Sequence, residues 1–403
     1  MPRQHTNDQG RFKLSHTLQG LSEGVNALAI SPDGLFLLSG CTDGQLMIWN
    51  ITTGERLQDI DCAFNGQISC ITWTDTTRAF VFGCGDGSVH LYRWSGAKGC
   101  YIYVVQEKAH SDAVQNVAYD SQHKRIASIS KSSLQMWAVV DSRVLKLLFS
   151  HTIVSEYQGR TVHFCDDGAS VISTYLESHQ IACHTIEPWT LKWIKQIPTR
   201  FGGSALNGKQ IMVSNLCDGL DLYSLPTMEL KRNFTHAIAL NVILQVEIIS
   251  QLQWAVVGGD DGFVRIFDMR SGSFLFSLVH GETGHLVQTL TTYEGSDNVL
   301  IATASSQDGD IAIKIWTRMN SVAPKVVDNQ EHLIPQVPAP SSLSLAQLVL
   351  IFALVSVVIN QISAYFTRLT AGGTLDDMVQ LMLSSVLVSS IVNTTQGISN
   401  SNL

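Results

Sequence analysis

An aromatic residue, or a histidine in its place, closes a short alternating segment seven times along this chain. The positions are Trp49, Tyr92, Trp137, His184, Tyr223, Phe267 and Trp316, with gaps of 43, 45, 47, 39, 44 and 49 residues. A near-constant period of this size indicates that one structural unit is repeated and stacked. A unit of this length holds four short strands, and such a sheet cannot bury both of its faces without neighbours.

The first repeat shows the predicted strands most clearly. They are Ala27–Ile30, Phe36–Ser39 and Leu46–Trp49, and turn residues separate them. An Asp-Gly turn precedes the third strand in four repeats, at Asp43-Gly44, Asp86-Gly87, Asp218-Gly219 and Asp261-Gly262. Seven sheets arranged radially would cover one another and leave little exposed edge. The predicted fold class is therefore all-β, a seven-bladed β-propeller, with the boundaries in repeats three to five left open.

These turns and strands resemble the WD-repeat family. The segments "TDGQLMIWN" and "DDGFVRIFD" carry the likeness, which covers about Arg11–Asn320. Most members also have a Gly-His pair early in each repeat, hydrogen-bonded toward the turn aspartate. Here the first repeat has Gly20-Leu21 at that place, and the third keeps His110 but has Lys131 instead of the aspartate. We therefore expect an incomplete polar network inside the blades.

The last repeat has no good fourth strand of its own. Its predicted strands are His285–Thr291, Val299–Thr303 and Ala312–Trp316. The segment Arg11–Leu18 precedes the first repeat and has strand character. The family closes its ring with such a segment, and an unpaired sheet edge is unfavourable. We therefore expect Arg11–Leu18 to complete the last blade.

The resemblance also implies where partners would bind. In the family, interaction residues lie early in each innermost strand and just before the turn aspartate, on loops of one face. The matching positions here are Asn26, Thr42, Gln67, Gly85, Gln115 and Asp260. The alternative is that these are solvated loop residues without a partner. The expected partners are proteins or peptides.

The charge and cysteine content of the chain limit which other kinds of partner or ligand are expected. The net charge is −8, from 26 basic and 34 acidic residues, and the basic residues form no run. Nucleic acid binding needs clustered cations, so no direct nucleic acid partner is expected. The eight cysteines form no Cys-x-x-Cys pair, and Cys41 and Cys84 occupy equivalent positions in adjacent repeats. We expect buried free thiols packed inside blades, with zinc or a disulfide as the alternative.

Catalytic motifs are sparse. The chain has no His-Glu-x-x-His motif, no nucleophile elbow and no phosphate-binding glycine loop. The glycine-rich segments Gly83–Gly87 and Gly258–Gly262 lie between strands and are predicted turns. His179 and His184 are a weak metal candidate, because His184 replaces a core aromatic residue. We therefore expect no enzyme activity, cofactor or metal; a hydrolase or isomerase is the alternative.

The C-terminal part differs in composition. Residues 1–10 are predicted to be disordered, residues 11–320 form the propeller, and residues 321–342 form a linker containing Pro and Ser. Leu343–Phe366 just reaches the roughly twenty apolar residues that a bilayer core requires, so it is a predicted transmembrane helix. The alternative is a buried helix, which the Asn360-Gln361 pair favours. Residues 374–392 form a second hydrophobic helix, either a span, a re-entrant piece or an interfacial helix, and residues 393–403 a disordered tail.

Two functions from different classes fit this layout. The first is a non-catalytic scaffold held at a membrane, single-pass or as a hairpin, with the propeller facing the cytosol because no cleavable signal begins the chain. The second is a guanine-nucleotide exchange factor for a small GTPase. A cytosolic propeller with a C-terminal anchor is similar to the endoplasmic-reticulum exchange factor that starts vesicle-coat assembly. Only the layout favours this second hypothesis.

Overall fold

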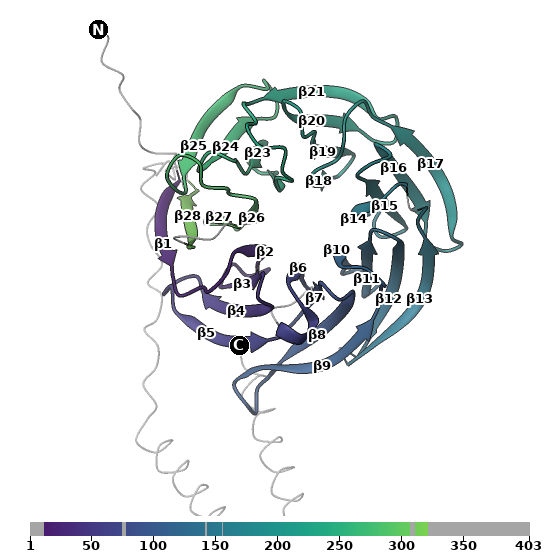
Figure 1. The fold of residues 1–403 in the computed structure, drawn as a ribbon, viewed down its shortest axis with the longest axis vertical. Helices are drawn as coiled ribbons and strands as arrows, with labels where there is room; N and C mark the ends of the chain where they lie inside the picture. The colour runs from purple at the N-terminus through teal and green to yellow at the C-terminus, as the bar shows by residue number, and fades with distance from the viewer. Residues whose placement is uncertain (1–11, 75–77, 142, 155, 307–310, 321–403) are drawn as a thin grey trace, which may run out of the picture. The chain divides into compact units, whose positions relative to one another are not determined.

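The computed structural model describes residues 12–74, 78–141, 143–154, 156–306 and 311–320. Within these ranges the chain forms seven antiparallel sheets of four strands each. Figure 1 shows the sheets arranged as blades around a common centre, with the first strand of each blade innermost. The predicted seven-bladed propeller is confirmed.

The first four blades follow one another along the chain. Blade 1 consists of β2 (Val25–Ile30), β3 (Phe36–Cys41), β4 (Gln45–Asn50) and β5 (Arg56–Asp61), followed by the 3₁₀ helix η1 (Ala63–Asn65). Blade 2 consists of β6 (Ile68–Trp73), β7 (Ala79–Cys84), β8 (Ser88–Ser95) and β9 (Cys100–Lys108). Blade 3 consists of β10 (Val114–Asp120), β11 (Arg125–Ser130), β12 (Ser133–Val140) and β13 (Val144–Thr152). Blade 4 consists of β14 (Gly159–Cys165), β15 (Ser170–Tyr175), β16 (Gln180–Thr185) and β17 (Thr190–Gln196).

The last three blades complete the ring. Blade 5 consists of β18 (Ser204–Asn207), β19 (Gln210–Ser214), β20 (Gly219–Ser224) and β21 (Glu229–Thr235). Blade 6 consists of β22 (Val246–Ile249), β23 (Trp254–Val257), β24 (Phe263–Asp268) and β25 (Phe274–Val279). Blade 7 consists of β26 (Thr289–Glu294), β27 (Asn298–Ala304), β28 (Ile313–Met319) and β1 (Lys13–Leu18).

The N-terminal strand closes the ring, as expected. β1 pairs antiparallel with β28, and Leu18 lies opposite Ile313. Leu18 is buried in a cluster that contains residues of blades 7 and 1. Phe12 lies 6.4 Å from the ring of Trp254 and 6.5 Å from that of Phe276, both in blade 6. The segment therefore ties blades 6, 7 and 1 together.

The predicted first strand of blade 7 begins too early. β26 starts at Thr289, not at His285. The N–H of His285 instead donates to the Glu282 carbonyl in a turn, and Val287 forms an isolated bridge with Gly259 of blade 6. The apolar residues before Thr289 contact the neighbouring blade, which periodicity within one strand does not reveal.

The seven repeating aromatic positions share one structural setting. Each lies in the third strand of its blade, and the register with the outermost strand shifts there in every blade. Such a bulge bends the outer strand and increases its twist. In blade 4, His184 is buried and stacks on Trp189 at 4.7 Å between ring centroids. An imidazole can fill this position because Trp189 supplies the missing ring surface.

A buried histidine organises blade 3. His110 contacts the hydroxyls of Ser128, at 2.9 Å, and Ser133, at 2.6 Å. The indole N–H of Trp137 donates to the same Ser128 oxygen at 3.1 Å. Burial lowers the pKa of His110 to about 4, so the ring is neutral near pH 7. Lys131 stands where the family has an aspartate in this turn, and the partners of His110 here are serine hydroxyls.

Blade 7 contains the same arrangement, which was not predicted from the sequence. His280 contacts the Thr303 hydroxyl at 2.7 Å, and the indole N–H of Trp316 donates to that oxygen at 3.1 Å. Blade 1 keeps only the bond from Trp49 to Ser39, at 2.9 Å. The network is therefore partial, as expected, and differs from blade to blade.

All eight cysteines lie in the described ranges, and all are free thiols. Cys41 and Cys84 are fully buried at the ends of β3 and β7. Burial raises the pKa of Cys41 to about 12. The predicted packing of these two thiols inside blades is confirmed.

The predicted N-terminal tail, linker, transmembrane helix, second hydrophobic helix and C-terminal tail lie outside the described residues. Within the described part of the chain, we find no helix with the length and apolar character needed to cross a bilayer.

Candidate functional site

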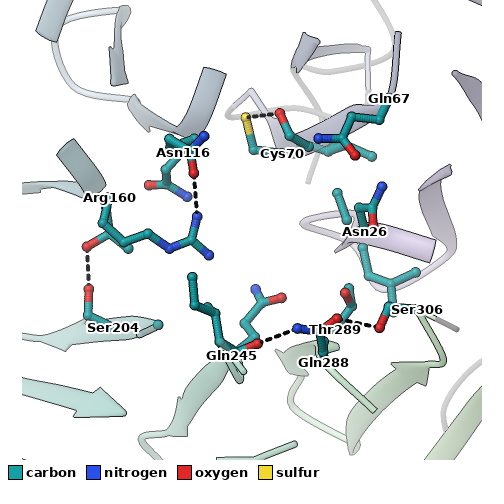
Figure 2. A pocket seen from close by; sticks show the side chains of 18 residues that line it. Asn26, Gln67, Cys70, Asn116, Arg160, Ser204, Gln245, Gln288, Thr289 and Ser306 are labelled. Atoms are coloured by element: carbon teal, nitrogen blue, oxygen red, sulfur yellow. Dashed lines mark hydrogen bonds between the residues drawn. The ribbon is translucent and has the colours of Figure 1, made fainter. Parts of the chain in front are cut away.

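One cavity lies where the innermost strands of the blades begin (Figure 2). Its volume is about 290 Å³. All seven blades contribute to the wall, and the polar side chains that line it include Asn26, Gln67, Ser69, Gln115, Asn116, Arg160, Thr161, Ser204, Gln245, Gln288, Thr289 and Ser306. The cavity reaches the surface, because Gln67 in its wall is exposed.

A recurring backbone feature directs side chains into this cavity. In blades 1 to 4 the innermost strand contains a bulge, which releases one residue from pairing with the second strand. A bulge re-aims the side chain of the released residue. In blades 5 to 7 the equivalent residue directly precedes the paired strand. These seven positions are Asn26, Ser69, Gln115, Arg160, Gly203, Gln245 and Gln288.

Hydrogen bonds between neighbouring blades hold the wall in place. The Asn116 amide oxygen accepts the backbone N–H of Val162, at 3.1 Å, across the junction of blades 3 and 4. The hydroxyls of Thr161 and Ser204 lie 2.6 Å apart across the next junction. The Thr289 hydroxyl donates to the Val25 carbonyl at 3.1 Å, where blade 7 meets blade 1. The wall is therefore ordered before any ligand binds.

Arg160 is the one charged side chain among the eighteen described residues that line the cavity. Its Nη1 donates to the side-chain oxygen of Gln115 at 2.9 Å, and its Nε donates to the Gly202 carbonyl at 3.3 Å. Both acceptors are neutral. Burial lowers the pKa of the guanidinium below its usual value.

A second ionisable group lies near this wall on β22. Burial raises the pKa of Glu247 to about 7, and the Gln245 amide donates to its carboxyl at 3.5 Å. The equivalent positions of the other blades are uncharged: Leu28, Ile71, Val117, Val162, Ala205 and Leu290. Glu247 is therefore the exception in an otherwise aliphatic layer.

The structure brings three of the six predicted partner-binding residues to the cavity: Asn26, Gln67 and Gln115. Thr42 and Gly85 lie beside them, in the turns between second and third strands. The Thr42 N–H donates to the Gly24 carbonyl at 2.9 Å, and the Gly85 N–H donates to the Gln67 carbonyl at 2.8 Å. Partner binding by these residues stays a prediction.

Asp260 has a different environment. Its side chain is buried and does not line the cavity. One carboxylate oxygen accepts the backbone N–H groups of Ala239 and Leu240, each at 2.5 Å. This geometry gives Asp260 a structural role in holding the loop that leads to blade 6.

The wall residues of the later blades were not among the predicted binding positions. Arg160, Gln245 and Gln288 follow Asn26 and Gln115 at nearly the same repeat spacing. That spacing was the available signal. The irregular repeats obscure it in blades 4 and 5, and in blade 7 the predicted inner strand begins at His285, before Gln288.

One further group of potential metal ligands lies in blade 4. The sulfur atoms of Cys165 and Cys183 are 4.0 Å apart, and a carboxylate oxygen of Asp166 lies nearby. Lys192 Nζ is 2.7 Å from that carboxylate. The lysine already neutralises Asp166, so we assign this group as an ion pair beside two thiols.

Comparison with known proteins places the fold in context. Residues 12–50 match the family described as WD domain, G-beta repeat. The chain is similar to Meiotic fizzy-related protein 2 of Schizosaccharomyces pombe, with 26% identity over 118 residues, 29% of this chain and 23% of the relative. It is also similar to Protein ALTERED SEED GERMINATION 2 of Arabidopsis thaliana, with 32% identity over 97 residues, which cover 24% of this chain and 13% of the relative. A third similar protein is Small ribosomal subunit protein RACK1 of Medicago sativa, with 45% identity over 49 residues, which cover 12% of this chain and 15% of the relative. The chain thus spans less than a quarter of each relative, and these matches support a WD-repeat propeller.

Proposed function

We propose that this WD-repeat propeller is a non-catalytic scaffold, which binds protein or peptide partners through the face where the central cavity opens. The observation that supports the proposal is the wall of that cavity. Every blade presents a residue there, either from a bulge in its innermost strand or from the position directly before that strand, and six of these seven residues have polar side chains.

The chemistry of the wall suits a polypeptide partner. Amides and hydroxyls both donate and accept hydrogen bonds, as a peptide backbone does. Blade-to-blade hydrogen bonds fix the wall, which lowers the ordering cost of binding. The WD-repeat fold is also typically non-catalytic. One relative is named as a small ribosomal subunit protein, and thus as a component of an assembly.

Membrane attachment is the second part of the proposal, and it is supported by sequence alone. Leu343–Phe366 would anchor the chain, as a single span or as a hairpin with residues 374–392, and the propeller would face the cytosol. Anchoring raises the effective concentration of partners near the surface without new contacts. Carbonate extraction checks this: the full chain should stay with membranes, and a truncation ending at Asn320 should be released. Release of both would contradict the anchor.

The exchange-factor hypothesis has no specific support among the described residues. A nucleotide-release assay against small GTPases separates it from the scaffold. Acceleration of release by the full chain would favour the exchange factor, and unchanged rates would favour the scaffold.

A matched pair of substitutions tests the binding face. Gln67 lies in the cavity wall, and Gln106 lies on the outer strand β9; both are exposed. Gln67→Trp, which adds bulk without charge, should deplete the partners recovered with the tagged chain from cells, and Gln106→Trp should leave them unchanged. Equal recovery by the two variants would contradict the assignment of this face.

A further inference from the structure

The central cavity has an uncompensated charge. Among the described residues that line it, the guanidinium of Arg160 faces amides, hydroxyls, aliphatic groups and the Cys70 thiol. Burial raises the pKa of Cys70 to about 12, so this thiol is neutral near pH 7. A partly buried cation without a counter-ion is unfavourable, because it has lost part of its hydration.

Part of the guanidinium is also available for a ligand. Nη1 and Nε bond to the neutral oxygens of Gln115 and Gly202. Nη2 has no hydrogen bond to a described residue, and Figure 2 shows Arg160 extending into the cavity. An arginine carries five N–H donors in a planar fork, which matches the two oxygens of a carboxylate.

The size and charge of the cavity select among anions. A volume of about 290 Å³ exceeds what a bare carboxylate fills and leaves room for adjoining residues of a peptide. A phosphate group carries about −1.5 to −2 charges at pH 7, which one guanidinium cannot balance. A carboxylate carries one negative charge, which Arg160 balances.

We propose that Arg160 is a specificity-determining residue, which pairs with an Asp or Glu side chain that a partner inserts into the central cavity. Asn26 and Gln67, at the same wall, would bond the partner's adjoining backbone. This inference rests on the proposed scaffold function and assigns it an acidic partner segment.

Degenerate peptide libraries test the proposal. The immobilised full-length protein is exposed to three libraries of nonamer peptides. The central residue is Glu, Gln or phosphoserine, and the eight flanking positions hold uncharged residues. The wild-type protein should retain the Glu library about tenfold better than the Gln library, as a charge-assisted pair requires. The ratio should fall to about one in Arg160→Gln and stay unchanged in Arg143→Gln, an exposed site with the same loss of charge.

Three results would overturn the proposal. They are equal retention of the Glu and Gln libraries, a Glu preference that survives in Arg160→Gln, or stronger retention of the phosphoserine library than of the Glu library. If thermal unfolding shows that Arg160→Gln does not fold, Arg160→Lys decides. It keeps the charge but not the fork, so its Glu preference should be reduced, and an undiminished preference refutes the pairing. Retention of all three libraries at equal strength would remove the acidic specificity and leave the scaffold function standing.

Discussion

Ring closure by the N-terminal strand can be tested with one pair of substitutions. Leu18 is 3% exposed and packs between blades 7 and 1, whereas Leu14 of the same strand is 46% exposed. Leu18→Ala removes three carbon atoms, worth about 2.4 kcal/mol at about 0.8 kcal/mol for each buried methylene. The cavity that remains brings the expected loss of unfolding free energy to about 2–5 kcal/mol.

The assay is thermal unfolding of the full chain followed by circular dichroism. A domain of this size loses roughly 2 °C in Tm for each kcal/mol, so Leu18→Ala should lower Tm by about 4–10 °C. Leu14→Ala makes the same chemical change at an exposed site and should stay within about 0.5 kcal/mol of wild type. Equal shifts for the two variants, or no shift for Leu18→Ala, would refute closure of the ring by β1.

Three further predictions concern polar and titratable groups. Thr303→Val should lower the unfolding free energy by about 1–3 kcal/mol, because two buried partners of its hydroxyl lose their hydrogen bonds; Thr292→Val, at a partly exposed site with no such bonds, is the control in urea unfolding. Burial lowers the pKa of five histidines to about 4; they are His90, His110, His163, His184 and His280. On acidification from pH 6.5 the unfolded chain therefore takes up protons before the folded chain does. Each of these sites should lower the free energy of unfolding by about 3 kcal/mol by pH 4. The raised pKa of Glu247 acts in the opposite direction between pH 7 and 4.5, but it is one group, so Tm should fall steadily, and a Tm that is flat or rises would contradict these burials. A thiol reagent should modify exposed Cys217 of the native chain first and leave buried Cys41 unmodified, as mass spectrometry of digested protein would show; early modification of Cys41 would contradict its packing.

The blades were predictable from sequence because their signals are local. An aromatic residue after an alternating segment and an Asp-Gly turn before it depend on neighbours in the same hairpin. Even His184 could be placed, since the period located it although its residue type did not fit. Its partner Trp189 follows within the same blade.

Features that join blades were harder to predict. The start of β26 depends on contacts with blade 6, and the role of Asp260 depends on two N–H groups some twenty residues earlier in the chain. Arg160 enters the cavity because a bulge redirects it, and no residue type in the sequence marks that bulge. Ring closure by β1 was predictable only through resemblance to a family, because its partner strand lies at the other end of the propeller.

The proposed scaffold function requires that partners bind at the cavity face of the ring. A photo-activated cross-linking residue at Gln67, compared with the same residue at Gln106 on the outer strand β9, tests this most directly. Irradiation in intact cells should give covalent protein adducts from position 67 and none from position 106. Adducts from position 106 alone would contradict the claim, and would place the binding surface on the outer edge of the blades.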